Sequence, residues 1–179
     1  RFELNPAESG GAYVYATEAD PSQWAMGVSL GLGEDLDGVL IHEFAHLLTL
    51  QAKEVPPAIN GDGDANECPT YDTGEGCALS GSTMAEFVQR FWPASLLEEL
   101  ERANAASDEE AFTDFHDARR DEFVTDYAST NPAEDLAETF TVFVLRDRPT
   151  GDTIADQKVQ LLWADPEMVA LRTEIRANR

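Results

Sequence analysis

Hydrophobic and polar positions change their spacing along the chain. β-Branched and aromatic residues predict short strands over 12–15 and 27–32, with turn residues at 20–22 between them. From position 82 onward, apolar residues recur every three to four positions, and the runs that begin at 82, 93 and 108 each start at a capping residue or a proline. We therefore expect an α+β protein that is mainly α, with a small N-terminal β-sheet.

Helices are expected throughout the C-terminal part of the chain. The spacing predicts them over 82–91, 93–104, 108–118, 154–164 and 166–176. A further helix has its own start signal, since Asn131 suits the N-cap, Pro132 the first helical position and Glu134 the third. Its apolar run continues to Leu145, so this helix is expected to be buried.

An earlier helix, expected over about 35–51, contains the pentapeptide HEFAH, from His42 to His46. Residues i and i+4 share one face of a helix, so both imidazoles can reach the same ion. The flanking residues are apolar, which disfavours an ordinary surface helix, and buried polar groups need partners. The pattern predicts zinc bound by His42 and His46, with Glu43 beside the metal as general base.

A catalytic zinc normally has a third protein ligand. Glu138 lies inside the apolar helix that follows Asn131, where a carboxylate would be costly without a cation, so it is the predicted ligand. Asp135 lies one turn earlier and is expected to accept the outer N–H of a ligand histidine. His116 is the alternative third ligand, and Glu138 could instead form a salt bridge. Asp135 could instead cap the helix. For Glu134, helix capping is the preferred role.

The HEFAH motif and the downstream Tyr-x(3)-Asn-Pro-x-Glu-Asp-x-Ala-Glu segment together resemble the gluzincin zinc peptidases. More narrowly, the chain is similar to bacterial secreted zinc-binding metallopeptidases related to the catalytic domain of anthrax lethal factor. The resemblance covers about 38–145, and the segment between the motifs matches only loosely. It implies a zincin-like metallopeptidase domain, with the small sheet packed on the active-site helix.

The resemblance also implies a role for each matching residue. Zinc ligands would be His42, His46 and Glu138, and the general base would be Glu43. Tyr127 matches a tyrosine whose hydroxyl stabilises the oxyanion of the reaction; the alternative is a half-buried aromatic residue before a helix cap. The chain departs from many gluzincins at Val142, where they carry an acid, so Asp135 is taken as its substitute.

Length and composition are those of a single domain over 1–179, with 42% hydrophobic residues to build a core. Within it we expect a β part over about 1–33, the HExxH helix, a cysteine loop over about 60–81 and a helical part over about 82–179. We expect a monomer whose partner is a peptide or protein substrate.

The net charge of −23 excludes nucleic acid or an anionic membrane as the main partner. No apolar stretch is long enough for insertion into a membrane. Strong acidity with only two lysines fits a salt-rich habitat or a secreted protein, or it marks a solvated surface and nothing more. The chain opens at Arg1 without a signal-like segment, so we expect an excised mature domain that is secreted or at the cell surface.

Cys68 and Cys77 bracket a short Gly-rich loop. A disulfide there would stabilise a loop that packing does not hold, and it would suit an exported protein. The alternative is a pair of reduced thiols.

Oxygen-bearing and small side chains alternate over 60–67, as they do in Ca²⁺ loops. The full EF-hand spacing and its final glutamate are missing. An ordinary Asx-rich turn is therefore favoured over a Ca²⁺ site.

These observations predict a secreted zinc peptidase. An extended substrate would pair with an edge strand beside the active-site helix. One alternative is an inactive zincin-like binding module that keeps zinc for structure. The other is a metal-dependent hydrolase of a non-peptide substrate, since ligands alone do not specify an amide bond.

Overall fold

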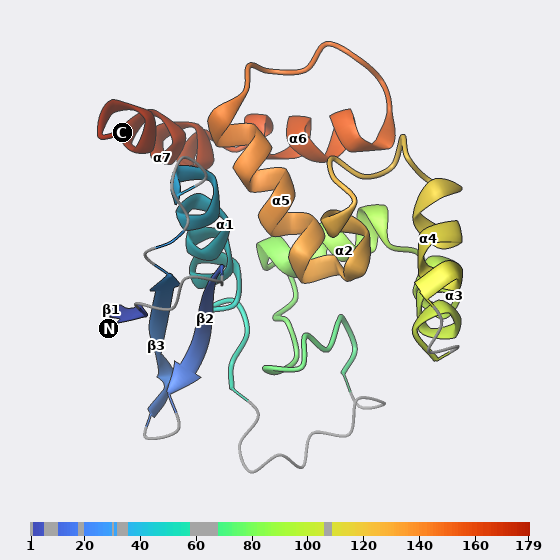
Figure 1. Cartoon of the computed structure of the whole chain (residues 1–179), viewed down its shortest axis with the longest axis horizontal. Helices are drawn as coiled ribbons and strands as arrows, with labels where there is room; N and C mark the ends of the chain where they lie inside the picture. Colours follow the sequence, from blue (N-terminus) through green and yellow to red (C-terminus); the bar gives the residue numbers. More distant parts are fainter. Residues whose placement is uncertain are drawn as a thin grey trace. The chain divides into compact units, whose positions relative to one another are not determined.

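The structure is a computed structural model that describes residues 2–5, 11–17, 20–29, 31, 36–57, 68–105 and 109–179 (Figure 1). The chain divides into two compact units, Arg1–Glu86 and Phe87–Arg179. The first unit contains the strands and helix α1 (Leu36–Thr49), and most of the other described elements are helices. The expected class, α+β and mainly α, is confirmed.

Three strands form the sheet of the first unit: β1 (Phe2–Asn5), β2 (Ala12–Thr17) and β3 (Asp20–Ser29). Their order is β1-β3-β2, with β1 parallel and β2 antiparallel to β3. The turn predicted at 20–22 is wrong, because β3 already begins at Asp20. The turn-forming chemistry of Asp20 is nevertheless present, since its carboxylate accepts hydrogen bonds from the amide of Ser22 and the side chain of Gln23.

The central strand β3 is buried from Ala25 to Ser29. Gly27 lies opposite Tyr13 of β2, and a Cβ at position 27 would overlap the Tyr13 ring. The absence of a side chain there lets the Tyr13 ring cover the strand. Among the described residues β2 pairs with β3 alone, and it also contacts α1, so the predicted packing of sheet against this helix is present.

Hydrogen bonds connect the segment after α1 to the start of helix α2 (Thr83–Phe91). The backbone carbonyl of Glu54 accepts from the amide of Leu79, and its carboxylate accepts from the amide of Thr83, both at 2.8 Å. Ser82 caps the helix, since its hydroxyl accepts from the amide of Ala85 at 3.1 Å. Orphan amides at the start of α2 are thereby satisfied.

The predicted disulfide is confirmed. Cys68 and Cys77 are bonded, and their Cα atoms lie 5.5 Å apart. A short antiparallel bridge joins Asp72 to Cys77 inside the loop, and the amide of Ala78 donates to the carbonyl of Tyr71. The Ca²⁺ loop considered for 60–67 lies outside the described residues.

Helices make up the second unit (Figure 1). Beyond α2 they are α3 (Ala94–Ala105), α4 (Glu109–Asp117), the 3₁₀ helix η4 (Tyr127–Thr130), α5 (Pro132–Leu145), α6 (Ile154–Ala164) and α7 (Pro166–Ala177). The α-helical ranges agree with the predicted ones to within one residue at each end, because caps and prolines mark these ends in the sequence.

Helix α5 is fixed at both ends within the second unit. At its start, the side chain of Asn131 accepts from the amides of Ala133 and Glu134, which confirms the predicted N-cap. At its end, Arg172 and Arg176 of α7 donate to carbonyls of the last turn. Helices α6 and α7 both contact α5, so this helix is the centre of the unit (Figure 1). None of the described helices is long and apolar enough to cross a membrane.

The disulfide gives a first test of stability. Replacing both Cys68 and Cys77 by Ser should lower the unfolding free energy by about 2–3 kcal/mol, because the unfolded chain is no longer constrained by the short loop. Urea denaturation of the double variant measures this loss, with the parent protein in reductant as the control. A change below about 1 kcal/mol would show that the loop is held by its other contacts.

Candidate metal centre

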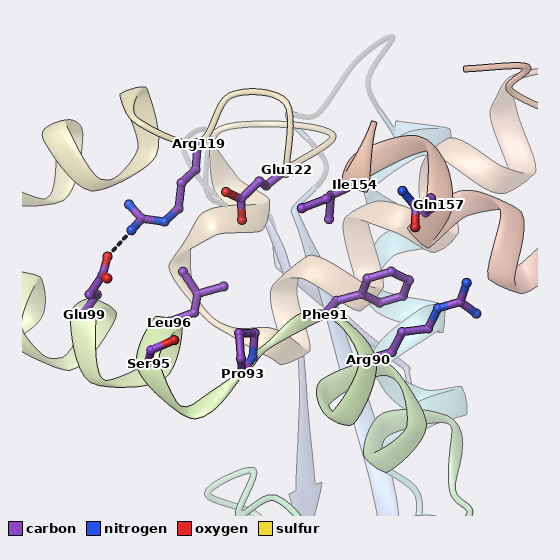
Figure 2. Close-up of a pocket in the computed structure, with 10 residues that line it drawn as sticks. All are labelled: Arg90, Phe91, Pro93, Ser95, Leu96, Glu99, Arg119, Glu122, Ile154 and Gln157. Atoms are coloured by element: carbon purple, nitrogen blue, oxygen red, sulfur yellow. Dashed lines mark hydrogen bonds and ion pairs between the residues drawn. The ribbon is translucent and has the colours of Figure 1, made fainter. Parts of the chain in front are cut away.

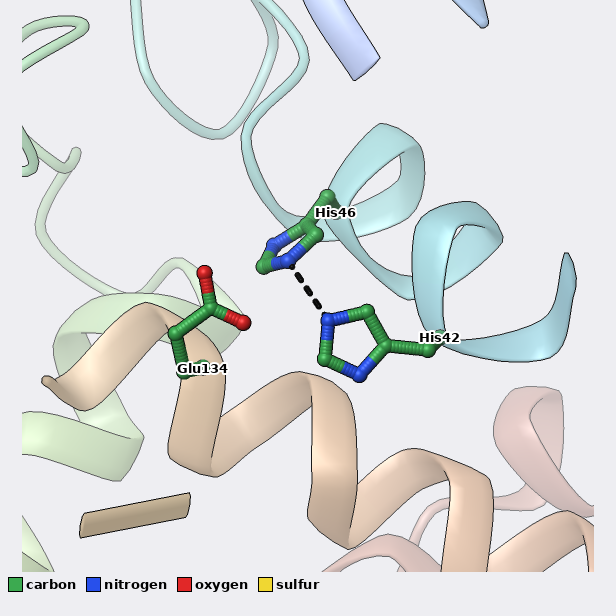
Figure 3. Close-up of side chains that lie close together, drawn as sticks. All are labelled: His42, His46 and Glu134. Carbon is green, nitrogen blue, oxygen red and sulfur yellow. Dashed lines mark hydrogen bonds between the residues drawn. The ribbon is translucent and has the colours of Figure 1, made fainter. Parts of the chain in front are cut away.

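The two histidines of the HEFAH motif lie together on α1, as predicted. His42 is 9% exposed and His46 is 7% exposed. Their Nε2 atoms are 3.1 Å apart, and the rings meet edge to face (Figure 3). One turn of helix therefore brings two imidazole nitrogens to a single point in a largely buried environment.

The spacing of these nitrogens suits two chemical states. Without an ion, 3.1 Å is a hydrogen bond in which one ring donates its Nε2 proton to the other. Two nitrogens that bind one tetrahedral Zn²⁺ at about 2.0–2.1 Å lie about 3.3 Å apart. Exchanging the shared proton for a metal ion thus requires only a small separation of the rings.

Glu43 follows His42 directly and is also buried, at 7% exposure. Successive residues of an α-helix are turned by about 100° around its axis. Glu43 therefore points about 100° around α1 from His42 and is buried as His42 is; its role as general base stays a prediction.

The acidic residues of α5 occupy two different sides of that helix. Glu134 and Glu138 are four positions apart and share one face, and both are half-buried. Glu138 accepts a hydrogen bond from the Thr125 hydroxyl at 2.7 Å, and the same hydroxyl accepts from the amide of Ala128 at 3.1 Å. Glu138 thereby links α5 to η4, the segment that begins with Tyr127.

A ring nitrogen from each of His42 and His46 and a carboxylate oxygen of Glu134 lie within 4.8 Å of one another (Figure 3). This group could hold a metal ion. The sequence-based preference for Glu134 was a capping role; that role stays a prediction, and the Asn131 side chain supplies the N-cap. Glu138, the predicted third ligand, is not a member of the group, and its role as a ligand stays a prediction. The four-residue spacing of the two glutamates was the sequence signal that Glu134 shares the Glu138 face.

Asp135 was expected to accept the N–H of a ligand histidine, and that role stays a prediction. Its carboxylate is fully buried, accepts from Trp92 Nε1 at 2.8 Å, and lies 2.7 Å from Lys158 Nζ. Asp135 belongs to the buried face of α5, which packs inside the second unit. Burial raises the pKa of Asp135 to about 6, and the Lys158 ammonium opposes that rise.

Lys158 of α6 was not singled out by the sequence. It is 1% exposed, and its ammonium group donates to the Glu122 carbonyl at 2.6 Å as well as facing Asp135. Burial lowers its pKa, and the neighbouring Asp135 carboxylate opposes this shift. A lysine within the apolar spacing of 154–164, in a chain with only two lysines, was the available signal.

The remaining predicted site residues lie in the second unit. Tyr127 is 53% exposed on η4, and its role at the oxyanion stays a prediction. His116, the alternative ligand, is on α4 with Nε2 3.1 Å from a carboxylate oxygen of Asp126 and Nδ1 3.4 Å from one of Asp117. These contacts place His116 in an acidic environment of its own.

The second unit also contains a pocket of about 450 Å³ (Figure 2). Apolar side chains of Phe91, Leu96 and Ile154 line it, together with the ion pair of Arg119 and Glu99. None of the predicted catalytic or metal-binding residues lines this pocket. Comparison of the chain with protein-family models, curated proteins and solved structures gives no match.

The zinc content of two variants tests which glutamate belongs to the metal group. Glu134→Ala should remove most bound zinc, because the ion loses its only carboxylate within the group. Glu138→Ala is the matched control, since it makes the same substitution on the same helical face and should keep the zinc. Elemental analysis after dialysis against a mild chelator measures both. Loss of zinc in Glu138→Ala alone would assign the ligand to Glu138.

Proposed function

We propose that the chain is a secreted zinc peptidase of the gluzincin type, with a zincin-like catalytic domain. In this proposal His42, His46 and Glu134 hold the ion, and Glu43 is the general base. The observation that carries the proposal is the grouping of these three ligand side chains, whose donor atoms lie within 4.8 Å of one another.

The donor set fits zinc. Two imidazoles and one carboxylate are the protein ligands of many catalytic zinc sites, which keep a fourth position for water or substrate. When bound, zinc would lower the pKa of a coordinated water and polarise the carbonyl of a substrate. A structural zinc site normally has four protein ligands, so a group of three among the described residues favours catalysis over the alternative of an inactive binding module.

Glu43 supplies the proton transfer in this mechanism. It would take a proton from the attacking water and deliver it to the leaving amine, which requires a carboxylate near the metal but not bound to it. Its position directly after His42 and its burial support this role. A binding module would have no need of such a carboxylate.

The Tyr127 hydroxyl would donate a hydrogen bond to the oxyanion that forms during hydrolysis. Its side chain is 53% exposed, so it is accessible to a substrate. The hydrogen bond from Thr125 to Glu138 supports this assignment, because it ties the segment carrying Tyr127 to the helix that carries Glu134.

The open side of strand β2 in the described part of the first unit supports a peptide as the substrate. Among the described residues, β2 has a strand partner on one side only, and it contacts α1, the helix of the histidine pair. An extended peptide could add to β2 through backbone hydrogen bonds, with little dependence on its side chains. This arrangement favours a peptide over a non-peptide substrate. Secretion is supported by the disulfide of Cys68 and Cys77, since such bonds persist in oxidising compartments.

The proposed function predicts a specific loss in Glu43→Gln. Its kcat against a quenched fluorescent peptide library should fall at least about 100-fold, because general acid–base transfer is lost while the ligands remain. The zinc content should stay at the parent value. Glu101→Gln, an exposed substitution of the same kind on α3, should keep full activity.

Two results would contradict this proposal. Parent-like activity of Glu43→Gln would show that another group is the base. A zinc-loaded parent that cleaves no member of the library, while still binding peptides, would favour the binding module.

A further inference from the structure

Trp92, Glu122, Asp135 and Lys158 form a buried polar cluster in the second unit, hereafter the lysine cluster. The Asp135 carboxylate accepts from Trp92 and lies 2.7 Å from the Lys158 ammonium group. The same ammonium donates to the carbonyl of Glu122 at 2.6 Å. These contacts join α6 to the first turn of α5 and to the segment before η4.

Aromatic rings enclose the ammonium group on its other sides. Lys158 Nζ lies 4.1 Å from the ring centroid of Phe123, 5.9 Å from that of Trp92 and 6.0 Å from that of Phe87. A cation is attracted to the faces of aromatic rings, and this attraction grows as water is excluded. The lysine head is thus held from several directions and has one well-defined position.

Such a cluster is a poor way to gain stability alone. Buried ion pairs can often be replaced by apolar residues of similar size without loss of stability, whereas removing one partner leaves a costly buried charge. A buried pair instead fixes direction, because hydrogen bonds require particular angles and apolar contacts do not.

The cluster lies next to a residue of the metal group, Glu134. Asp135 follows Glu134 directly, and the cluster holds Asp135 within the first turn of the helix, next to the Asn131 cap. Holding one side chain of that turn fixes the rotation of α5 about its axis, and this rotation sets where the Glu134 side chain points.

We infer that Lys158 is a positioning residue for metal binding, acting through Asp135 to orient the Glu134 carboxylate. The inference rests on the proposed function, in which Glu134 is a zinc ligand. Groups that hydrogen-bond a metal ligand commonly contribute about 10–100-fold to metal affinity. We expect an effect of the same order from Lys158.

The test measures zinc affinity of the full chain by competition with a chromophoric chelator. Lys158→Met should weaken zinc binding about 10–100-fold, because methionine fills the lysine stem but cannot hold Asp135. Since this variant buries an unpaired carboxylate and could fail to fold, Asp135→Asn/Lys158→Met is measured beside it. The double variant should regain the parent's urea midpoint, because no unpaired charge is buried, and yet keep the weakened affinity.

The same substitutions in a Glu134→Ala background distinguish a loss of Glu134 orientation from a general loosening of the packing. There, adding Asp135→Asn/Lys158→Met should leave the residual zinc affinity unchanged, because the residue that the cluster orients is gone. The same loss in both backgrounds would overturn the inference, as would parent-like zinc affinity in the stable double variant. A parent that binds zinc while the Lys158 variants bind it equally well refutes this inference alone. A parent that binds no zinc refutes the proposed function and the inference together.

Discussion

The burial of ionisable side chains on helices α1 and α5 is the constraint on which the rest of this structure depends. Neither helix can place a histidine or a carboxylate in an apolar environment without giving it a partner. On α1 the two imidazoles meet each other, and on α5 Asp135 meets Lys158 and Trp92. The α1 contact fixes the two rings relative to each other, because both are on the same helix. The α5 contacts reach Lys158 of α6 and Trp92, so they fix the rotation of α5 about its axis.

The two faces of α5 divide its carboxylates by role. Asp135 points into the second unit, where an aromatic and cationic environment holds it. Glu134 and Glu138 lie on the other face, one grouped with the histidine pair and one hydrogen-bonded to Thr125. A turn of about 100° per residue is enough to give neighbouring acids unrelated partners. Three acids within five positions therefore have three separate sets of partners.

Sequence reasoning was most successful where the physical cause is local. Caps and prolines define helix ends through bonds to residues two or three positions away, so the ends of α5 and α7 could be predicted. The cysteine pair was predictable because the loop between the two residues is short. The start of β3 was not, since the hydrogen bonds of Asp20 occur in a turn and in this strand alike.

The sequence by itself determined the helix of the histidine pair, the position of Glu43 on it, and the polar and apolar positions of the helix that carries the acids. These features follow from periodicity along one element. Only the tertiary structure decided which acid joins the histidines and which one pairs with Lys158. That choice depends on the rotation of α5 about its axis. Its rotation is set by side chains from Trp92 to Arg176, which are distant in sequence and close only after folding.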